Sequence, residues 1–310
     1  SEAQSAFGDG SIYLEKYLKR PRHIEIQVMA DAHGAVLHFG ERDCSVQRRH
    51  QKMIEEAPSS ALTPELRARM GETAVAAARA VGYRNAGTIE FLFEGGEFYF
   101  LEMNTRIQVE HPVTELVMGI DLVQWQLRIA AGEALPFEQS AIRPNGHAIE
   151  CRITSEDPAN GFLPSTGRIT LLEMPGGPGV RWDGGIAEGV DIGLFYDPLL
   201  GKLIVHAPDR EGALDRMHRA LAELRVVGVE TSASFHRRVM REPSFRSGDV
   251  TIRYLEEHPE LLAADVDDDI LRSAAVAAAL LEDASRTRRG AKRIVVDGTA
   301  RSGWREAGWR

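Results

Sequence analysis

The first regular pattern in the chain is an alternation of apolar and polar residues. Residues 23–31 place isoleucine or valine at every second position, with Glu25 and Gln27 between them. This period of two is typical of a strand with one apolar and one polar face. A turn at 31–34 and a second run at 35–39 follow. The pattern therefore predicts a β-hairpin.

A second hairpin is predicted further along the chain. Residues 87–93 and 98–103 are rich in aromatic residues and flank the segment Glu94-Gly95-Gly96-Glu97, which supplies the flexible turn. Residues 12–18, IYLEKYL, are also expected to form a short strand.

Two helices carry recognisable end signals. Thr63 is a good N-cap and Pro64 a good first helical residue, and this helix is expected to end near Gly82. Asp121 is expected to cap another helix over 122–131.

The remaining sequence predicts a second region and a tail. Strands are expected at 146–153, 167–172 and 201–206, and helices at 209–224 and 232–240. The tail carries an acidic run at 264–269, a helix candidate at 271–282, a basic run at 286–293, and Gly-Trp-Arg at 303 and 308. The predicted fold class is α/β (α+β), with regions 1–145, 146–258 and 259–310, the last a linker or docking segment.

Composition narrows the functional classes. The 310 residues are 43% hydrophobic, which is ordinary for a globular protein, and carry a net charge of −9. This charge argues against nucleic acid or an anionic membrane as a partner. The two cysteines, Cys44 and Cys151, show no metal-site spacing, and no signal peptide or membrane span is visible. A cytoplasmic location is expected.

The register of the second hairpin decides whether Glu90 and Glu102 meet. A two-residue loop would pair Glu90 with Leu101 and place the two acids on opposite faces. A three-residue loop, 95–97, would pair Glu90 directly with Glu102. Opposed carboxylates repel, and a divalent cation such as Mg²⁺ would reverse that cost. A solvated polar face is the alternative.

Polar residues also recur after Glu102. Residues 102, 104, 106, 108 and 110 are all polar and would share one face if the segment stayed extended. Arg106 and Gln108 would add anion-binding groups beside the acids, which favours a metal site over a solvated surface.

Two long strings resemble the signature sequences of biotin carboxylases. They are residues 102–112, EMNTRIQVEHP, and residues 41–52, ERDCSVQRRHQK, and the similarity runs from Phe7 to about Glu257. The resemblance implies part of an ATP-grasp domain followed by a biotin carboxylase C-terminal domain, usually as a homodimer. It suggests the α subunit of an acyl-CoA carboxylase, in which residues 259–310 would be a linker or the start of a docking or biotin-carrier region.

The resemblance also implies roles for individual residues. Residues expected to contact the nucleotide are Glu15, Lys16, Leu18, His23, Gln47, His50 and Leu92. Those expected to hold Mg²⁺ (or Mn²⁺) are Glu90, Glu102 and Asn104. Those expected to bind bicarbonate are Lys52, Arg106, Gln108 and Val109. Glu110 would be the general base, and Arg152 would lie at the biotin ureido oxygen. Taken singly, most of these residues could be ordinary core or surface residues, and Arg152 could pair with Glu150.

The implied reaction is phosphorylation of bicarbonate by ATP, followed by carboxylation of biotin. Biotin would be carried on another domain or chain, because none of the five lysines lies in a biotinylation motif. A biotin carrier domain and a carboxyltransferase subunit are therefore the expected partners. The family's N-terminal domain and glycine-rich lid have no counterpart in the sequence, so little activity is expected from this chain alone. The alternatives are another ATP-grasp ligase or a non-catalytic fragment that folds and dimerises.

Overall fold

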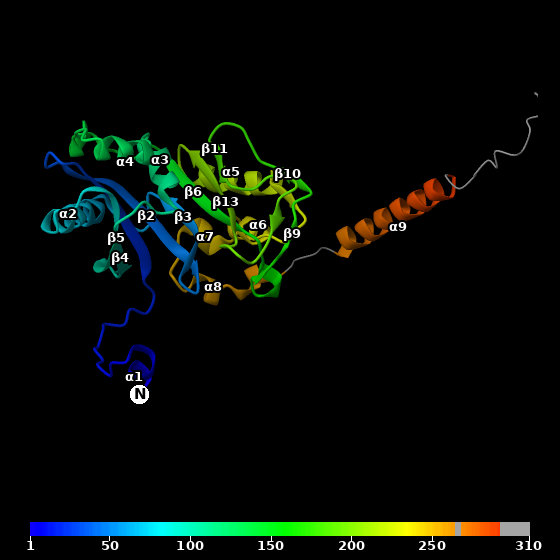
Figure 1. Ribbon diagram of the computed structural model, residues 1–310, viewed down its shortest axis with the longest axis horizontal. Coiled ribbons are helices and arrows are strands. Elements are labelled where there is room, and N and C mark those ends of the chain that lie inside the picture. The colour runs from blue at the N-terminus through cyan, green and yellow to red at the C-terminus, as the bar shows by residue number, and fades with distance from the viewer. Residues whose placement is uncertain (264–267, 292–310) are drawn as a thin grey trace, which may run out of the picture. The chain divides into compact units, whose positions relative to one another are not determined.

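Eight strands form one antiparallel sheet (Figure 1), and half of the predicted site residues lie on these strands. The computed structural model describes residues 1–263 and 268–291. The sheet order is β11-β13-β6-β3-β2-β1-β4-β5. Its strands are β1 (Arg22–Ala30), β2 (Val36–Arg48), β3 (Gln51–Ala57), β4 (Asn85–Glu94), β5 (Glu97–Asn104), β6 (His147–Thr154), β11 (Val180–Gly184) and β13 (Leu199–Ala207).

The pairing of β3 with β6 joins the two predicted regions into this one sheet. Ile54 lies opposite Cys151, and Glu55 lies opposite Glu150. Both predicted hairpins are present, as β1–β2 and β4–β5. Side chains from the first region therefore lie beside those of the second without an intervening loop.

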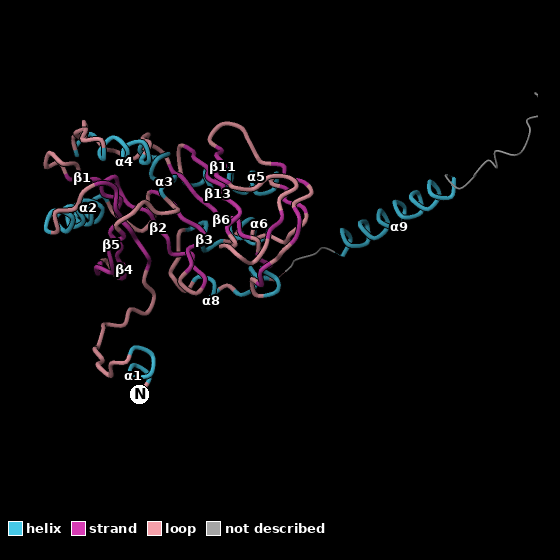
Figure 2. The backbone as a smooth tube through the Cα atoms, in the orientation of Figure 1, coloured by secondary structure: helices cyan, strands magenta, loops and turns pink. Residues whose placement is uncertain are grey.

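Helices cover both faces of the sheet (Figure 2). The chain divides into two units, and the first comprises Ser1–Ala263. Its helices are α1 (Glu2–Phe7), α2 (Pro64–Ala80), α3 (His111–Met118), α4 (Leu122–Ala130), α5 (Arg210–Glu223), α6 (Ala233–Val239), α7 (Pro243–Ser247) and α8 (Tyr254–Glu257). α3 and α4 pack on one face through Val113 and Trp125, whereas α2 and α5 pack on the other through Met70 and Leu214.

The helix ends agree with the capping signals. The Thr63 hydroxyl accepts a hydrogen bond from the backbone N–H of Leu66 at 3.3 Å, and the Asp121 carboxylate accepts one from Gln124 at 2.7 Å. Gly82 adopts φ of 59° just after α2. The left-handed conformation explains why glycine suits this C-terminal position.

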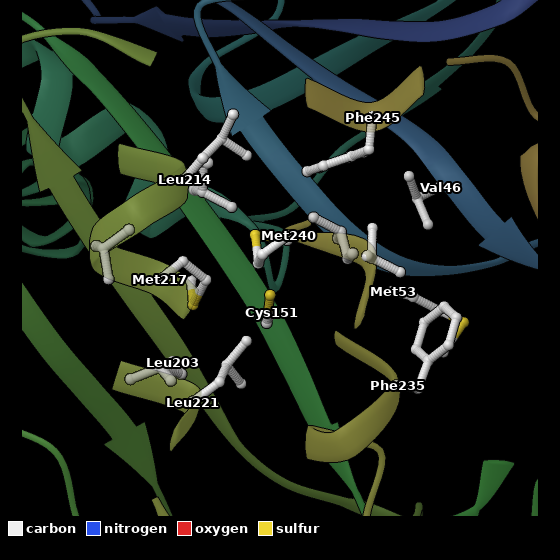
Figure 3. Packing of buried hydrophobic residues seen from close by; sticks show 14 of the residues in the cluster. Val46, Met53, Cys151, Leu203, Leu214, Met217, Leu221, Phe235, Met240 and Phe245 are labelled. Carbon is white, nitrogen blue, oxygen red and sulfur yellow. The ribbon is translucent and has the colours of Figure 1, made fainter. Parts of the chain in front are cut away.

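The largest apolar cluster lies between β6, β13 and the helices α5 and α6. Figure 3 shows Cys151 and Leu203 of the sheet among Leu214, Met217 and Met240. These side chains are fully buried. Alternate residues of β6 thus fill this core, and the residues between them face α3.

The strand predicted at 12–18 is wrong. These residues form no strand, and the side chains of Ile12, Tyr13, Leu14 and Tyr17 are 79–99% exposed. In the described part of the chain no strand pairs with this segment. A strand needs a hydrogen-bonding neighbour, which an apolar pattern alone cannot supply.

The strand predicted at 167–172 divides into two. Gly167–Arg168 (β9) pairs with Asp191–Ile192 (β12), whereas Leu171–Glu173 (β10) pairs with Arg225–Val227 (β14). The other short pair is β7 (Glu156–Asp157) with β8 (Leu163–Pro164). Three-residue 3₁₀ turns lie at η1 (Gln139–Ala141) and η2 (Pro158–Asn160), and a longer one at η3 (Pro259–Leu262).

The second unit, Ala264–Arg310, contains one described helix, α9 (Asp268–Ala291). It includes the helix predicted at 271–282, which is confirmed and extends further at both ends. The Gly-Trp-Arg copies at 303 and 308 lie outside the described residues. Across residues 1–263 and 268–291, no helix is long and apolar enough to cross a membrane.

Candidate active site

A cavity of about 860 Å³ opens on the side of the sheet where α3 begins. Strands β1 to β6 contribute to its walls, together with residues 106–110 and 196–199. The predicted site residues that line it are His23, Gln47, His50, Lys52, Glu90, Glu102, Asn104, Arg106, Gln108, Val109, Glu110 and Arg152. The structure thus brings together all the residues predicted for metal, bicarbonate and biotin, and three of the seven predicted for the nucleotide.

The four remaining predicted residues lie outside this cavity. Glu15 and Lys16 belong to the exposed segment before β1, and the Lys16 Nζ atom donates to the Tyr99 hydroxyl at 2.6 Å. Leu18 and Leu92 are partly buried. Their expected contact with adenine stays a prediction.

Charged residues form a continuous row across four strands. Arg42 on β2 lies opposite Glu25 on β1, Glu25 lies opposite Glu90 on β4, and Glu90 lies opposite Glu102 on β5. Three carboxylates in adjacent strands would repel without cations among them. The basic residues at this site are therefore required for the acids to be buried.

Lys52 neutralises the centre of the row. Its Nζ atom lies 2.5 Å from Glu25, 2.8 Å from Glu90 and 2.7 Å from Glu110. Burial acts to lower the pKa of Lys52, but these carboxylates, Glu25 foremost, outweigh burial and raise it. Lys52 is therefore a permanent cation at the cavity floor, suited to hold an anion.

Arg42 is a second, fully buried cation behind this row. Its guanidinium donates to Glu25 at 2.5 Å, to Gln27 at 2.7 Å and to Gln108 at 3.2 Å. Burial acts to raise the pKa of Glu25, yet Arg42 and Lys52 lower it to about 2. Glu25 is thus an ionised structural carboxylate that orients both cations.

Glu90, Glu102 and Asn104 form the predicted metal group. The Asn104 amide donates to Glu90 and Glu102 at 3.1 Å each, so both carboxylates converge on one point. His23 Nε2 lies 3.0 Å from the other Glu90 oxygen. Two carboxylates and an amide supply the hard oxygen ligands that Mg²⁺ takes. These residues fit such an ion.

His23, Glu25 and Glu90 form a second possible ligand group. One atom from each lies within 4.8 Å of the others, and all three residues are buried. However, Glu25 already contacts Arg42 and Lys52. Two cations at contact distance leave Glu25 little need of a metal, so the Glu90–Glu102 group is the better candidate.

The segment after β5 is not extended, contrary to the expectation for residues 102–110. β5 ends at Asn104 and Glu110 is the N-cap residue of α3. Gln108 is nevertheless buried in the site and donates to Glu90 at 2.6 Å. The turn places Gln108 and Glu110 in the cavity through a different backbone path.

Lys202 and Arg106 complete this wall. Lys202 on β13 donates to the backbone carbonyl of Val109 at 2.7 Å, which fixes the turn before α3. Arg106 is exposed and donates to the Ile107 carbonyl at 3.2 Å. A guanidinium has five donors, so further donors stay available for an anion.

Arg152 bridges two acids from different strands. Its Nε atom lies 2.7 Å from Glu55, and its terminal nitrogen lies 2.9 Å from Glu110. The pairing with Glu150 that the sequence allowed is replaced by Glu55 and Glu110. Glu110 therefore contacts Lys52 with one oxygen and Arg152 with the other.

Gln47 and His50 lie on the β2–β3 hairpin. Gln47 donates to the Cys44 carbonyl at 2.8 Å and lies opposite Lys52. Arg49 and His50 form the turn with φ of 48° and 66°, although neither is glycine. Such backbone strain is common where a binding site fixes a turn.

Sequence reasoning did not assign roles to Glu25, Arg42, Glu55 or Lys202. Glu25 was visible as a polar residue in an alternating strand, but that pattern predicts a solvated face. β1 lies inside the sheet, and its polar face is covered. Only the strand order shows that these residues are buried at the site.

Two family models match the chain. "Carbamoyl-phosphate synthase L chain, ATP binding domain" matches residues 1–138, and "Biotin carboxylase C-terminal domain" matches residues 150–257. Together they cover the eight-stranded sheet except for the first three residues of β6.

Curated relatives agree with these matches. A pyruvate carboxylase subunit from Methanothermobacter thermautotrophicus is 54% identical over 266 residues, 86% of this chain and 54% of the relative. Biotin carboxylase of Nostoc sp. is 54% identical over 257 residues, which are 83% of this chain and 58% of the relative. A chloroplastic biotin carboxylase of Arabidopsis thaliana is 53% identical over 264 residues, which are 85% of this chain and 49% of the relative. The chain thus spans about half the length of these relatives.

A solved structure shows the same fold. The biotin carboxylase domain dimer of Hydrogenobacter thermophilus 2-oxoglutarate carboxylase, in complex with MgADP, ADP and bicarbonate, is 52% identical. It superimposes with a TM-score of 0.81 over 86% of this chain and 59% of that one.

Proposed function

Because this chain belongs to the biotin carboxylase family, we propose that it forms part of an ATP-dependent ligase that carboxylates biotin. In this proposal residues 1–145 belong to the ATP-grasp domain and residues 146–258 form the C-terminal domain. The observation that carries the proposal is the position of Glu110, which contacts Lys52 and Arg152 at 2.7 and 2.9 Å in the cavity.

The first step needs a base and two cations. A bicarbonate oxygen forms a bond to the γ-phosphorus of ATP, the bond to the ADP oxygen breaks, and Glu110 takes the bicarbonate proton. Lys52 and Arg106 offset the repulsion between bicarbonate and ATP, because both are cations at the cavity. Glu90, Glu102 and Asn104 would hold Mg²⁺, which neutralises phosphate charge.

The second step transfers carbon dioxide to biotin. The phosphorylated bicarbonate releases carbon dioxide and phosphate. N1′ of biotin passes its proton to the released phosphate and forms the new carbon–nitrogen bond to carbon dioxide. Arg152 is the cation placed to stabilise negative charge on the ureido oxygen. Its two ion pairs hold the guanidinium at the cavity wall, so little reorganisation is needed.

The acceptor and the partners follow from the same proposal. Biotin would arrive on a carrier domain, and a carboxyltransferase subunit would use the product. An acyl-CoA acceptor stays a prediction, since a pyruvate carboxylase and a 2-oxoglutarate carboxylase are among the relatives. A homodimer is supported by the dimer of the Hydrogenobacter thermophilus domain. The cytoplasmic location also stays a prediction, because some relatives are chloroplastic.

Another ATP-grasp ligase is the weaker candidate. The ATP-binding model that matches residues 1–138 is named for carbamoyl-phosphate synthase, but residues 150–257 match the biotin carboxylase C-terminal domain. Arg152 belongs to this second part and contacts Glu110 directly. The match to the biotin carboxylase C-terminal domain and the contact between Arg152 and Glu110 together support biotin as the acceptor.

Biotin-dependent ATP cleavage by the complete subunit tests the proposal. We expect Arg106→Ala to lower turnover by roughly 100-fold while MgATP affinity stays near that of the unaltered protein. Arg84→Ala is the control, because Arg84 is exposed and lies outside the cavity. Equal loss of turnover and nucleotide binding would contradict the role of Arg106.

A further inference from the structure

Glu150 is a fully buried acid in the middle of β6. Its two cross-strand neighbours are Glu55 on β3 and Ile204 on β13. Neither is a cation, and one is another fully buried carboxylate. An ionised carboxylate in this position would be costly, because burial removes its hydration and Glu55 repels it.

The surroundings of Glu150 are apolar on one side. Ala148 and Ile204 belong to a buried cluster with Val113 and Val117 of α3. Two residues further along β6, Arg152 lies on the same face and reaches the cavity. Glu150 therefore lies between the apolar underside of α3 and the Arg152 side chain.

Three carboxylate oxygens here have no hydrogen-bond partner. They are both oxygens of Glu150 and Oε2 of Glu55, within the part of the chain that the structure describes. The other Glu55 oxygen accepts from Arg152 Nε at 2.7 Å. Buried polar atoms are nearly always paired, so this group calls for an explanation.

We propose that Glu55 and Glu150 share one proton and act as a positioning pair for Arg152. The proton resides on Glu150, which donates to Glu55, and Glu55 stays the carboxylate that binds the Arg152 guanidinium. Opposed residues on adjacent strands have Cβ atoms about 5 Å apart, which allows their carboxyl groups to meet. The importance of Arg152 for catalysis rests on the proposed function, whereas the shared proton does not.

The electrostatic surroundings agree with this arrangement. Burial raises the pKa of Glu55 to about 7, against the lowering effect of Arg152. Burial and Glu55 raise the pKa of Glu150 well above its ordinary value. The other titratable or charged groups that act on this pair are Lys52, Glu110, Cys151, Lys202 and, through Arg152, Cys44.

Lys202 does not replace the proton as a counterion. Its Nζ atom donates to the Val109 carbonyl at 2.7 Å and lies 3.7 Å from Asp183. Arg152 is likewise occupied by Glu55 and Glu110. If Glu150 is neutral, it needs no cationic partner, and the charges of Glu55 and Glu110 stay paired with Arg152.

Glu150→Gln and Glu55→Gln separate the two roles. A glutamine at 150 keeps the size of the side chain and can donate to Glu55 as the protonated acid does. A glutamine at 55 removes the charge that holds Arg152. We expect Glu150→Gln to keep or raise the melting temperature at pH 6, because it needs no proton uptake on folding, and Glu55→Gln to lower it, with Glu173→Gln as an exposed control.

The pH dependence of unfolding gives an independent readout. The pKa of Glu150 is raised in the folded protein, so folding binds a proton at pH values above about 4.3, the ordinary glutamate pKa. The melting temperature of the unaltered chain should fall relative to that of Glu150→Gln as pH rises from 5 toward 8. An equal fall in both proteins would overturn the proposal.

Infrared spectroscopy tests the proton itself. The unaltered chain should show the carbonyl band of a protonated carboxyl group at pH 6, and Glu150→Gln should lack it. Absence of that band in the unaltered chain would also overturn the proposal.

Activity of the complete subunit connects the pair with the proposed function. Glu150→Gln should keep biotin-dependent ATP cleavage within about twofold and flatten its pH profile, and Glu55→Gln should lower it about tenfold with MgATP affinity retained. Complete lack of such activity in the unaltered protein would refute the proposed function, while unfolding and infrared data would still decide the proton. Equal activity loss in both variants would overturn the positioning role.

Discussion

Glu90 and Glu102 lie directly opposite each other because Leu101 has no partner across the β4–β5 hairpin. The loop has two residues, Gly95 and Gly96, with φ of 62° and 84°. Without a bulge such a loop would pair Glu90 with Leu101. The register shifts after the Phe91–Phe100 pair, and the shift omits Leu101. The structure thus combines the two alternatives: the loop has two residues, and a bulge still pairs Glu90 with Glu102.

Glu102 is a better residue than Glu90 for a test of metal binding, because Glu90 is buried. Glu102 is exposed, so Glu102→Gln should keep the fold while it removes a negative ligand from the pair. We expect the affinity for MgATP to fall about 10-fold or more, measured by calorimetry on this chain and on the complete subunit. Glu97→Gln, on the same strand, is the matched control. An unchanged affinity would place the metal elsewhere.

Glu25 should contribute more to folding than any surface acid. Glu25→Gln leaves Arg42 and Lys52 with one negative partner fewer inside the protein. Loss of one member of a buried charge group costs about 3–5 kcal/mol. Urea unfolding should show this loss, whereas Glu223→Gln, which removes an exposed pair with Arg219, should cost less than about 1 kcal/mol. Similar losses for both variants would contradict the structural role of Glu25.

The protein should lose stability in acid through Glu56. His147 and Arg210 lie 2.8 and 2.7 Å from its carboxylate and outweigh burial, so its pKa is lowered to about 2. A lowered pKa adds stability that is complete above about pH 4.3 and is lost as pH falls toward 2.

Unfolding experiments from pH 7 to pH 3 should show this loss as a decreasing free energy of unfolding. Glu56→Gln should make the acid slope smaller and should remove roughly 3 kcal/mol at pH 7. If the slope of the variant equals that of the unaltered chain, other carboxylates cause the acid loss.

Arg152→Lys should impair turnover more than charge conservation suggests. Arginine joins Glu55 and Glu110 through two separate nitrogens, whereas lysine offers one point charge. We expect biotin-dependent ATP cleavage by the complete subunit to fall by roughly 10- to 100-fold, with nearly normal nucleotide affinity. Arg128→Lys, on the exposed face of α4, is the control. Full activity in Arg152→Lys would show that charge alone suffices.

Local sequence signals determined the elements with strong ends. The predicted helices begin after the capping residues Thr63 and Asp121, and the strand predicted from the alternating segment 23–31 is present as β1. Both signals are local, because capping and period-two patterns involve only a few neighbouring residues. The strings at 41–52 and 102–112 carried the resemblance from which cavity residues were predicted, although His23, Glu90 and Arg152 lie outside both strings.

The tertiary structure decided which polar residues are buried and which acids lie opposite one another. Glu25 and Glu150 look like solvent-facing residues of ordinary strands in the sequence. The order β6-β3-β2-β1-β4 places them inside the sheet, where each neighbour comes from a distant segment. Burial depends on those long-range pairings. Segment 12–18 has an apolar pattern but no paired strand, and most of its side chains stay exposed. A local pattern specifies a strand face, but only the packed sheet determines what that face meets.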